Sequence, residues 1–409
     1  MDFDDTREEA AFRKEAREWL AAHADEKRGA FETWQSRYPG RDGFDGLERA
    51  KAFQSKKAEA GFAALHWPEE WGGRALPPVY QVIYAQEEAR YLVPRGYFEI
   101  GLGMCMPTLF AFATAEQKKR YAPAALRGDE VWCQLFSEPA AGSDLAAVQT
   151  RARLQDDGSW RLTGQKVWTT NAQFASYGLL LARTDADVPK HNGLTMFIVP
   201  MDAPGVTVRG LRQISGEAEF NEVFFDDLAV DSSAVVGGVG NGWGTALTTL
   251  MFERVTIGLG SEGLGYNSSR FAAAIAADEH ARRDPEVRHQ LGEIGSELLA
   301  VRFTGYRTLT ALQKGQIPGP EAGLAKVTIV SAAIRAGDVI ADILGPDALS
   351  EDSEWAYMIS FLPGLKSAGG TEEILRNTIG ERVLGLPPAP RLDKGIPFSE
   401  LRSKETAAA

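Results

Sequence analysis

Residues 133–145 read CQLFSEPAAGSDL, and the hydrophobic pattern of the chain changes at this stretch. The side chains between Pro139 and Asp144 are mostly small, so the backbone here is open to close approach by another group. Taken alone, the stretch fits an ordinary Ser- and Gly-rich surface loop about as well. The regions on either side of it decide the fold class.

Three regions with different periodicities surround and include this stretch. Residues 1–129 repeat apolar side chains at helical spacing, and residues 130–238 carry short β-type runs separated by turn signals. In residues 239–409 helical spacing returns in long, Ala-rich stretches. This order predicts an α+β, mainly α fold: an N-terminal helical domain, a central small antiparallel, β-barrel-like domain and a C-terminal four-helix bundle.

Single elements can be predicted within these regions. Phe12, Ala16, Trp19 and Leu20 form one face of a helix, and residues 67–73 form a loop rich in Trp, Pro and Gly. The remaining patterns predict strands around residues 167–169, 179–181, 196–199 and 223–225, and bundle helices around residues 243–251, 286–314, 321–344 and 375–384.

Composition and charge limit the possible functions. The 409 residues are 44% hydrophobic and 24% charged, as in an ordinary globular protein. A formal net charge of −12 disfavours nonspecific binding to nucleic acid or to an anionic membrane. We find no apolar run of about 18 residues, and the acidic start, residues 1–5, lacks a signal-peptide core. We therefore expect a cytoplasmic protein with no membrane or nucleic-acid partner.

Cysteine and histidine give no sign of a disulfide framework or a metal site. Cys105 and Cys133 are the two cysteines, and we expect both to be reduced. The five histidines are scattered without metal-ligand spacing, so no metal is expected.

Residues 258–263, GLGSEG, match the dinucleotide-binding pattern GxGxxG, and the acidic Asp278 follows about 20 residues later. That pattern requires a strand directly before it and a βαβ unit around it. The preceding residues here have helical periodicity instead. We interpret the glycines as small residues that let one bundle helix pack closely on another.

Three segments resemble the acyl-CoA dehydrogenase family, and their order and spacing match it as well. Residues 133–145 are similar to the family's (T/S)-E-P-x-A-G-S-D signature. Residues 164–171, GQKVWTTN, are similar to G-x-K-x-(W/Y)-(I/T)-(T/S)-N, and residues 370–377, GTEEILRN, to G-T-x-x-I-x-R. The resemblance covers nearly the whole chain, including Gly72–Gly73 and residues 381–385. One motif is moderately specific, and three in order are a strong signal.

The resemblance implies an FAD-dependent enzyme and gives roles to several residues. Ser137 and backbone N–H groups from Gln134 onward would donate to the pyrimidine edge of the flavin, where negative charge develops when hydride arrives at N5. Ser143 would lie near the FAD pyrophosphate and the acyl-CoA. Trp168 would pack on the isoalloxazine face away from substrate, and Thr170 would hydrogen-bond near N5. Without the neighbouring motifs, a Trp buried in a β-domain would be the simpler interpretation of Trp168.

The implied reaction removes a proton from the α-carbon of an acyl thioester and a hydride from its β-carbon, giving a trans-2-enoyl-CoA. A desolvated carboxylate suits the proton transfer. In many family members a Glu precedes the G-T of the third motif, but Gly369 stands there in this chain. The isovaleryl-CoA and long-chain branches use the Glu of a Glu-Arg pair on the first bundle helix, where this chain has Glu253–Arg254. We predict that Glu253 is the base; an exposed Glu on a helix surface is the alternative.

Further residues complete the expected site. The thioester carbonyl needs donors, and the resemblance implies a flavin ribityl hydroxyl and the backbone N–H of Gly369. Arg254 would add positive potential, and Met251 and Ser143 complete the substrate-binding set. Thr371 and Glu373 of the third motif complete the cofactor-binding set.

Two segments depart from the family pattern. The family's R-x-x-F-G loop is replaced by residues 282–285, RRDP, and its Q-x-F-G-G-x-G by residues 342–348, DILGPDA. These changes put the contacts at the adenosine end of FAD in doubt. A homodimer or homotetramer is the ordinary expectation, and the departures indicate either a different oligomer interface or a partner subunit that completes the FAD site.

The expected electron acceptor is an electron-transfer flavoprotein. An acyl-CoA oxidase on the same fold, which passes electrons to O₂, is one alternative, and a non-catalytic or half-site subunit of a hetero-oligomer is another. The sequence does not identify the acyl group. A base on the first bundle helix is compatible with branched, long or bulky acyl chains.

Overall fold

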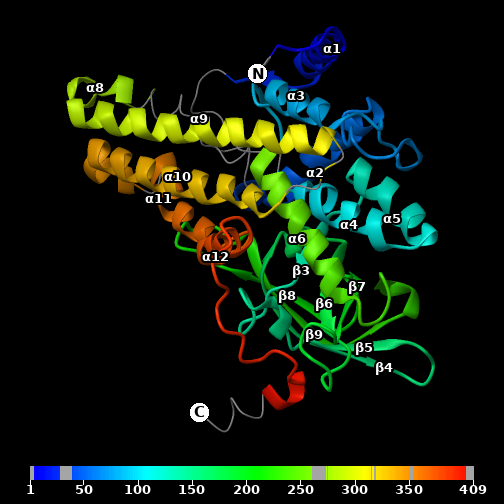
Figure 1. Cartoon of the computed structure of the whole chain (residues 1–409). Coiled ribbons are helices and arrows are strands. Elements are labelled where there is room, and N and C mark those ends of the chain that lie inside the picture. Colours follow the sequence, from blue (N-terminus) through cyan, green and yellow to red (C-terminus); the bar gives the residue numbers. More distant parts are fainter. Residues whose placement is uncertain are drawn as a thin grey trace.

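The computed structural model describes residues 4–27, 39–94, 96–259, 273, 275–314, 316, 319–350 and 353–401. The chain runs through an N-terminal helical region, a sheet and a C-terminal helical region (Figure 1). The helices of both terminal regions gather at one end of the molecule, and most of the sheet lies at the other.

The N-terminal region begins at a capping box, in which the Thr6 hydroxyl accepts from the Glu9 N–H and the Glu9 carboxylate accepts from the Thr6 N–H. The predicted apolar face is confirmed, because Phe12, Ala16 and Leu20 are buried. The elements of this region are α1 (Arg7–His23), β1 (Asp25–Glu26), α2 (Pro39–Glu59), the 3₁₀ turn η1 (Glu69–Trp71), α3 (Pro78–Glu88), β2 (Tyr91–Leu92), the π-helical turn η2 (Gly101–Cys105), α4 (Met106–Phe112) and α5 (Ala115–Arg127).

The middle region forms one eight-stranded sheet in the order β10-β7-β6-β4-β5-β9-β8, with β3 also paired to β6. Its strands are β3 (Trp132–Leu135), β4 (Arg151–Leu154), β5 (Trp160–Thr170), β6 (Tyr177–Arg183), β7 (Leu194–Pro200), β8 (Val206–Leu211), β9 (Phe220–Val230) and β10 (Val235–Val236). The four strand segments predicted from the sequence all lie within β5, β6, β7 and β9, and are confirmed.

Most strand pairs are antiparallel, as predicted, but β6 pairs in parallel with β3 and, at one position, with β4. The sequence patterns did not indicate these two pairings. Parallel neighbours need a long connection between them, and β4 and β5 lie between β3 and β6 in the sequence. The chain therefore has enough length to return to β3 in the same direction.

Apolar side chains of β6 and β7 alternate between two cores. Leu179 and Leu181 pack into the core shared with α4 and α5, and Leu180 packs into the core on the opposite face of the sheet. In β7, Met196 and Phe197 divide in the same way. A sheet that is covered on both faces favours continuous apolar runs, which explains why the strand around residues 179–181 shows no alternation.

The C-terminal region contains two long helices side by side, α9 and α10 (Figure 1), which share a core with α11. The bundle helices predicted from the sequence are confirmed, although the last one begins at residue 372 rather than 375, because Thr371 caps it. The elements are α6 (Gly242–Leu259), α8 (Glu279–Arg283), α9 (Pro285–Gln313), η7 (Pro320–Ala322), α10 (Gly323–Leu344), η8 (Gly345–Leu349), α11 (Glu354–Phe361), η9 (Leu362–Lys366) and α12 (Glu372–Arg382).

The segment GLGSEG begins in the last turn of α6, at Gly258 and Leu259, and residues 260–263 lie outside the described residues. The residues before it are helical, as predicted, so the strand that a dinucleotide fingerprint requires does not precede it.

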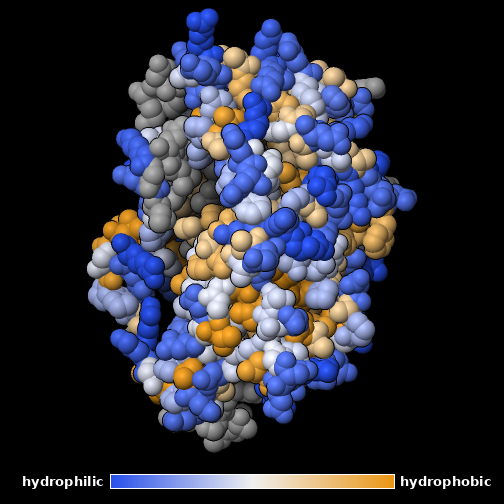
Figure 2. Space-filling view, turned by 90° about the vertical axis from the view of Figure 1, so that its right-hand side faces the viewer, coloured by the Kyte–Doolittle hydropathy of each residue, from blue (hydrophilic) through white to orange (hydrophobic). Residues whose placement is uncertain are grey.

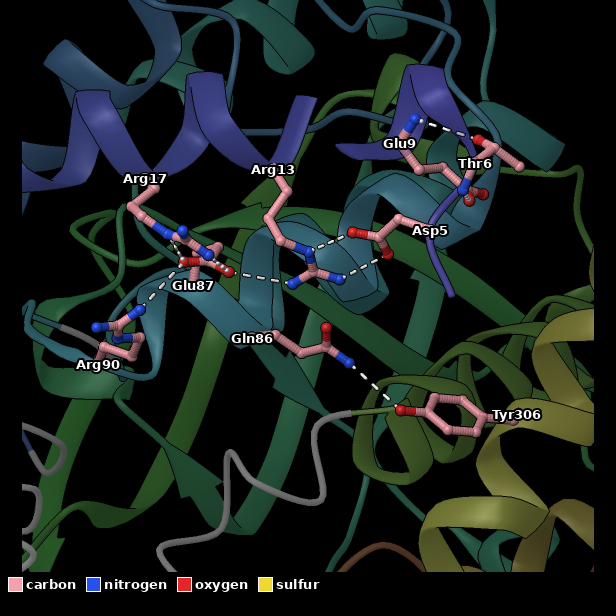
Figure 3. Close-up of polar contacts among 9 residues, drawn as sticks. All are labelled: Asp5, Thr6, Glu9, Arg13, Arg17, Gln86, Glu87, Arg90 and Tyr306. Carbon is pink, nitrogen blue, oxygen red and sulfur yellow. Dashed lines mark hydrogen bonds and ion pairs between the residues drawn. The ribbon is translucent and has the colours of Figure 1, made fainter. Parts of the chain in front are cut away.

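Ion pairs around the buried Glu87 hold α1 on α3 (Figure 3). Arg13 and Arg17 of α1 donate to its carboxylate at 3.1 Å and 2.8 Å. The preceding residue of α3, Gln86, faces the other way and donates to the Tyr306 hydroxyl of α9 at 3.4 Å. One turn of α3 therefore links the N-terminal helices to the bundle.

The chain returns to the sheet after α12, as the red segment of Figure 1 shows. The Phe398 N–H donates to the Val188 carbonyl at 3.0 Å. Lys190 lies 2.7 Å from a carboxylate oxygen of Asp144 and 2.5 Å from one of Asp393. This one lysine thus ties the C-terminal tail to the loop that carries the first motif.

The two cysteines are free and buried, and the Cys105 thiol lies 3.8 Å from the Cys133 carbonyl. Burial raises the pKa of both thiols. Among the described residues, no helix is both long and apolar enough to cross a membrane. The face shown in Figure 2 is mostly hydrophilic, with smaller hydrophobic patches.

Candidate active site

The first two motifs meet just after β3. The Val167 N–H donates to the Ser137 carbonyl at 2.9 Å, so the loop after β3 lies against β5. Gln134 is paired with Leu179 of β6 in the parallel ladder. The side chains of Gln134 and Ser137 are half-buried. Both residues therefore keep part of their surface open to solvent.

A buried ion pair fixes these two motifs from inside the sheet. The Lys166 side chain is fully buried, and its Nζ donates to Glu138 Oε1 at 2.8 Å and to the Phe136 carbonyl at 2.9 Å. The N–H groups of Gln149 and Thr150 donate to the same carboxylate at 2.6 Å and 2.9 Å. Burial opposes ionisation of Glu138, but the Lys166 ammonium and these hydrogen bonds outweigh it and hold the pKa of the carboxyl below its usual range.

Trp168 is directed outward by a bulge in β5. Its φ of 59° lies in the left-handed region, and the register with β9 shifts between Lys166 and Thr169. A bulge re-aims a side chain in this way. The Trp168 side chain is 60% exposed and touches Phe220 edge-on, so the alternative of a Trp buried in the β-domain is wrong. Thr170, two residues on, is half-buried at the end of the strand.

Ser143 lies in the exposed loop between the first motif and η3 (Leu145–Ala147). A Cβ added at Gly142 would meet no atom within 4 Å, so the backbone here is open to a ligand. The neighbouring Asp144 forms the ion pair with Lys190 described above.

Glu253 lies on α6, four residues after the fully buried Thr249. The Thr108 hydroxyl of α4 donates to the Thr249 hydroxyl at 3.0 Å, which fixes α6 on α4. Residues four apart share a helix face, so Glu253 follows this buried face, and its side chain is half-buried. Met251 is also half-buried, whereas the Arg254 side chain lies outside the described residues.

The third motif begins with two residues in the left-handed region, Gly369 at φ 66° and Gly370 at φ 86°. Thr371 then caps α12, since its hydroxyl accepts from the Ile374 N–H. Glu373, in the first turn of this helix, is exposed. Its own N–H and the Thr371 hydroxyl hold the pKa of its carboxyl below the usual value.

Lys326 of α10 joins the third motif to the helix of Glu253. This lysine is 6% exposed, and its Nζ donates to the Lys366 carbonyl at 2.8 Å and to the Gly370 carbonyl at 2.9 Å. The carboxylates of Glu253, Glu372 and Glu373 are close enough to act on its charge. Lys326 thus holds the loop of Gly369 by hydrogen bonds, and the negative charge of Glu253 acts on the same buried ammonium group.

Lys326 and Glu138 were not singled out from the sequence. Lys326 carried a readable signal, because it is the one charged residue in the apolar run GLAKVTIVSAAI, residues 323–334. Buried lysines are rare unless they are paired. Glu138 carried no comparable signal, since nothing in the motif distinguishes a buried Glu from an exposed one.

Both segments that depart from the family pattern adopt regular structure. Residues 282 and 283 end α8, and Pro285 begins α9 after a single intervening residue. Asp278 caps α8 by accepting from the Ala281 N–H at 2.7 Å. Residues 342–348 span the end of α10 and most of η8.

Family models match the three regions in order. The N-terminal, middle and C-terminal domains of acyl-CoA dehydrogenase match residues 6–129, 133–228 and 240–384. The acyl-CoA dehydrogenase IpdE1 of Mycobacterium tuberculosis is 38% identical over 381 residues, which cover 92% of this chain and 97% of that protein. The chain belongs to the acyl-CoA dehydrogenase family. It is accordingly an oxidoreductase that acts on acyl-CoA, and the cofactor of its family is FAD.

Further comparisons agree with this family. Human short-chain specific acyl-CoA dehydrogenase is 30% identical over 302 residues, covering 71% of this chain and 72% of that protein. A solved structure named "Tcur3481-Tcur3483 steroid ACAD" has a TM-score of 0.81 at 26% identity, covering 95% of this dehydrogenase and 100% of the other chain. The fold class predicted from the sequence is therefore confirmed.

The described residues of this acyl-CoA dehydrogenase fit a flavin. Trp168 presents a large aromatic ring at the surface. The half-buried Thr170 follows two residues later in β5, and the half-buried Ser137 accepts through its carbonyl from the N–H of the neighbouring Val167. A cavity of about 1270 Å³ lies elsewhere on the sheet, lined by residues that include Arg151, Trp160 and Phe398. None of the residues predicted to bind flavin or substrate lines that cavity.

Proposed function

We propose that this dehydrogenase converts an acyl-CoA thioester to its trans-2-enoyl form with Glu253 as the base. The observation that carries the proposal is the Gly369–Gly370 loop, which the buried Lys326 holds by a hydrogen bond and on whose anchoring ammonium group the charge of Glu253 acts. The reaction needs a carboxylate for the α-proton and a hydrogen-bond donor for the thioester carbonyl. Glu253 supplies the first, and the backbone N–H of Gly369 supplies the second.

The two groups act on the same step. When the thioester carbonyl accepts a hydrogen bond from Gly369, negative charge can move onto its oxygen, and the α-proton becomes more acidic. A donor of this kind typically lowers the barrier by about 3 kcal/mol. Glu253 then takes the α-proton on a carboxylate oxygen. FAD, when bound, would supply the acceptor for the hydride that leaves the β-carbon, and Ser137, Trp168 and Thr170 would hold its flavin.

The visible spectrum of the flavin tests the base. We expect a matching acyl-CoA to bleach the wild-type flavin without oxygen present, and Glu253→Gln to slow this step by about 10²–10⁴-fold. Glu279→Gln is the matched control, because Glu279 lies on the surface of α8 and pairs there with Arg283. Bleaching of Glu253→Gln at the wild-type rate would show that another group is the base.

For the acyl group we infer a bulky chain, such as one attached to a steroid ring system. Support comes from the structurally similar protein named a steroid ACAD, at 26% identity, and from the position of the proposed base on α6. The test is turnover of butyryl-, branched, long-chain and ring-bearing acyl-CoA thioesters. A sharp preference for butyryl-CoA contradicts this inference.

We further propose that a second subunit of the same family completes the FAD site. The departures at residues 282–285 and 342–348 support this, and so do the exposed apolar side chains of Val383, Leu384 and Leu386 after α12. The same observations favour a second candidate function, in which this chain is a non-catalytic or half-site subunit of a hetero-oligomeric dehydrogenase. Flavin content and mass of the chain expressed alone discriminate between the cases. A fully flavinated and active homo-oligomer contradicts the proposal of a second subunit.

The acceptor that we propose is an electron-transfer flavoprotein. Stopped-flow mixing of the substrate-reduced enzyme with that protein or with O₂ distinguishes a dehydrogenase from an oxidase. Fast reoxidation by O₂ with release of hydrogen peroxide would assign the oxidase reaction.

A further inference from the structure

Lys326 occupies a position where a lysine is unusual. It is the fourth residue of α10, only 6% exposed, in a segment whose other side chains are apolar or small. Burial of an ammonium group is costly unless hydrogen bonds and opposite charges compensate for it. The groups that compensate for burial of the Lys326 ammonium group therefore indicate the role of this residue.

Its hydrogen bonds enclose the loop that precedes α12. Nζ donates to the Lys366 carbonyl at 2.8 Å and to the Gly370 carbonyl at 2.9 Å. Gly369 lies between these two anchored carbonyls and has the left-handed φ of 66°. Both peptide groups flanking the segment 367–370 are thus tied to one rigid helix, and the orientation of the Gly369 N–H within this segment depends on that connection.

The negative charges of three carboxylates act on the same ammonium group from two other helices. These are Glu372 and Glu373 of α12 and Glu253 of α6. Burial lowers the pKa of Lys326, and these three carboxylates oppose that shift. Lys366, which affects the pKa of Glu373, is exposed and contributes its charge from the outer side of the loop.

We propose that Lys326 is a positioning residue for the reaction: by anchoring the loop on both sides of Gly369, it fixes the direction in which the Gly369 N–H donates to the thioester carbonyl. This inference rests on the proposed function, in which that N–H makes the α-proton acidic enough for Glu253 to remove. Misplacement of a reacting group by about 1 Å can cost about 10²-fold in rate. A buried lysine that only joins α10 to α12 would affect stability and leave the chemistry of the bound substrate unchanged.

The test separates proton abstraction from the rest of turnover. The probe is a 3-thiaacyl-CoA, in which sulfur replaces the β-carbon so that no hydride can leave. Mass spectrometry follows deuterium entering its α-position from D₂O on the flavin-loaded enzyme, with a second subunit present if FAD binding needs one. Rates are expressed per bound flavin, and thermal midpoints are recorded in parallel.

Lys326→Met keeps the apolar stem and removes the ammonium group. We expect the exchange rate and kcat to fall together by about 10- to 100-fold, with KM changed by no more than about threefold. Lys366→Met is the matched control, since it removes a neighbouring positive charge but keeps the carbonyl that Lys326 contacts. The control should keep the wild-type exchange rate.

Wild-type exchange per flavin in Lys326→Met, with only a lower thermal midpoint, overturns the proposal. If that variant does not fold, Lys326→Gln gives the same readout, because its shorter amide cannot reach both carbonyls as the ammonium does. Failure of both variants to fold assigns Lys326 to stability and also counts against the proposal. Glu253→Gln in the same assay tests the proposed function separately: exchange that persists there shows that the base is wrong, whatever the lysine variants do.

Discussion

At the scale of single residues, Lys166 holds the loop after β3 against β5 from inside the sheet. Its ammonium group is fully buried and depends on Glu138 and the Phe136 carbonyl for compensation. Removing one partner of such a pair leaves a buried charge uncompensated, which is far more costly than replacing both. The pair therefore couples the stability of the sheet to the shape of the proposed flavin-binding edge.

Glu138→Gln should lower the free energy of unfolding by about 3–5 kcal/mol at neutral pH. The folded-state pKa of Glu138 is depressed, so its contribution is fully present above the ordinary Glu pKa and is lost as pH falls through the depressed value. The difference between wild type and variant should therefore narrow in acid. Denaturant unfolding at several pH values measures the free energy of unfolding of both proteins. If the difference between wild type and Glu138→Gln stayed constant as the pH fell, the prediction would be wrong.

The role of a residue could be predicted where a sequence motif marks it, but not where only its position in the folded structure gives it that role. Trp168 was recognised from its motif, but its left-handed φ and the bulge that exposes it have no signature in the sequence. Lys326 lies far from the third motif in the chain, and its contact with Gly370 arises only when α10 packs against α12. Roles that depend on such long-range packing could not be predicted from local patterns.

At the scale of elements, the loop of residues 67–73 shows how closely the backbone can approach itself. A Cβ added at Gly73 would lie 2.0 Å from the Trp67 carbonyl oxygen, whereas one added at Gly292 in α9 would meet nothing within 4 Å. The first clash involves backbone, so no side-chain movement can relieve it.

Gly73→Ala should lower the free energy of unfolding by about 1–3 kcal/mol or more, because the loop must shift. Gly292→Ala should raise it by about 0.5–1 kcal/mol, because alanine in a helix interior loses less conformational freedom on folding. Thermal unfolding of the two variants measures both effects. If the two variants changed the thermal midpoint equally and in the same direction, the effects would not arise from the local surroundings of each glycine.

The hydrophobic periodicity predicted which segments form helices and which form strands, but it did not predict which strands pair. Helical spacing predicted α9 and α10 almost to their ends, since long amphipathic patterns repeat many times. The parallel pairing of β3 with β6 could not be predicted, because an apolar strand buried on both faces looks the same whichever direction its neighbour runs.

At the scale of the whole molecule, exposed apolar side chains gather where the bundle ends. Leu384 and Leu386 are 68% and 56% exposed, next to the similarly exposed Val383. Under the proposed assembly, a second subunit covers them.

Introducing charge there tests that assembly. Leu384→Glu combined with Leu386→Glu should weaken association and lower the flavin content of the complex, because buried unpaired carboxylates are costly. Leu154→Glu, at an equally exposed leucine in β4, is the control. Mass photometry and flavin absorption give the two readouts. Unchanged association in the double variant places the interface elsewhere.

Lys190 connects the loop of Asp144 with Asp393 in the tail that follows the last helix. The sheet region is therefore finished by residues that are translated more than 150 positions after its last strand. In the gene, the sheet region is therefore not encoded by one continuous segment that recombination or chimera design can exchange by itself. An exchange of the sheet between relatives has to transfer the distal tail with it, or the graft will lack the contacts that close it.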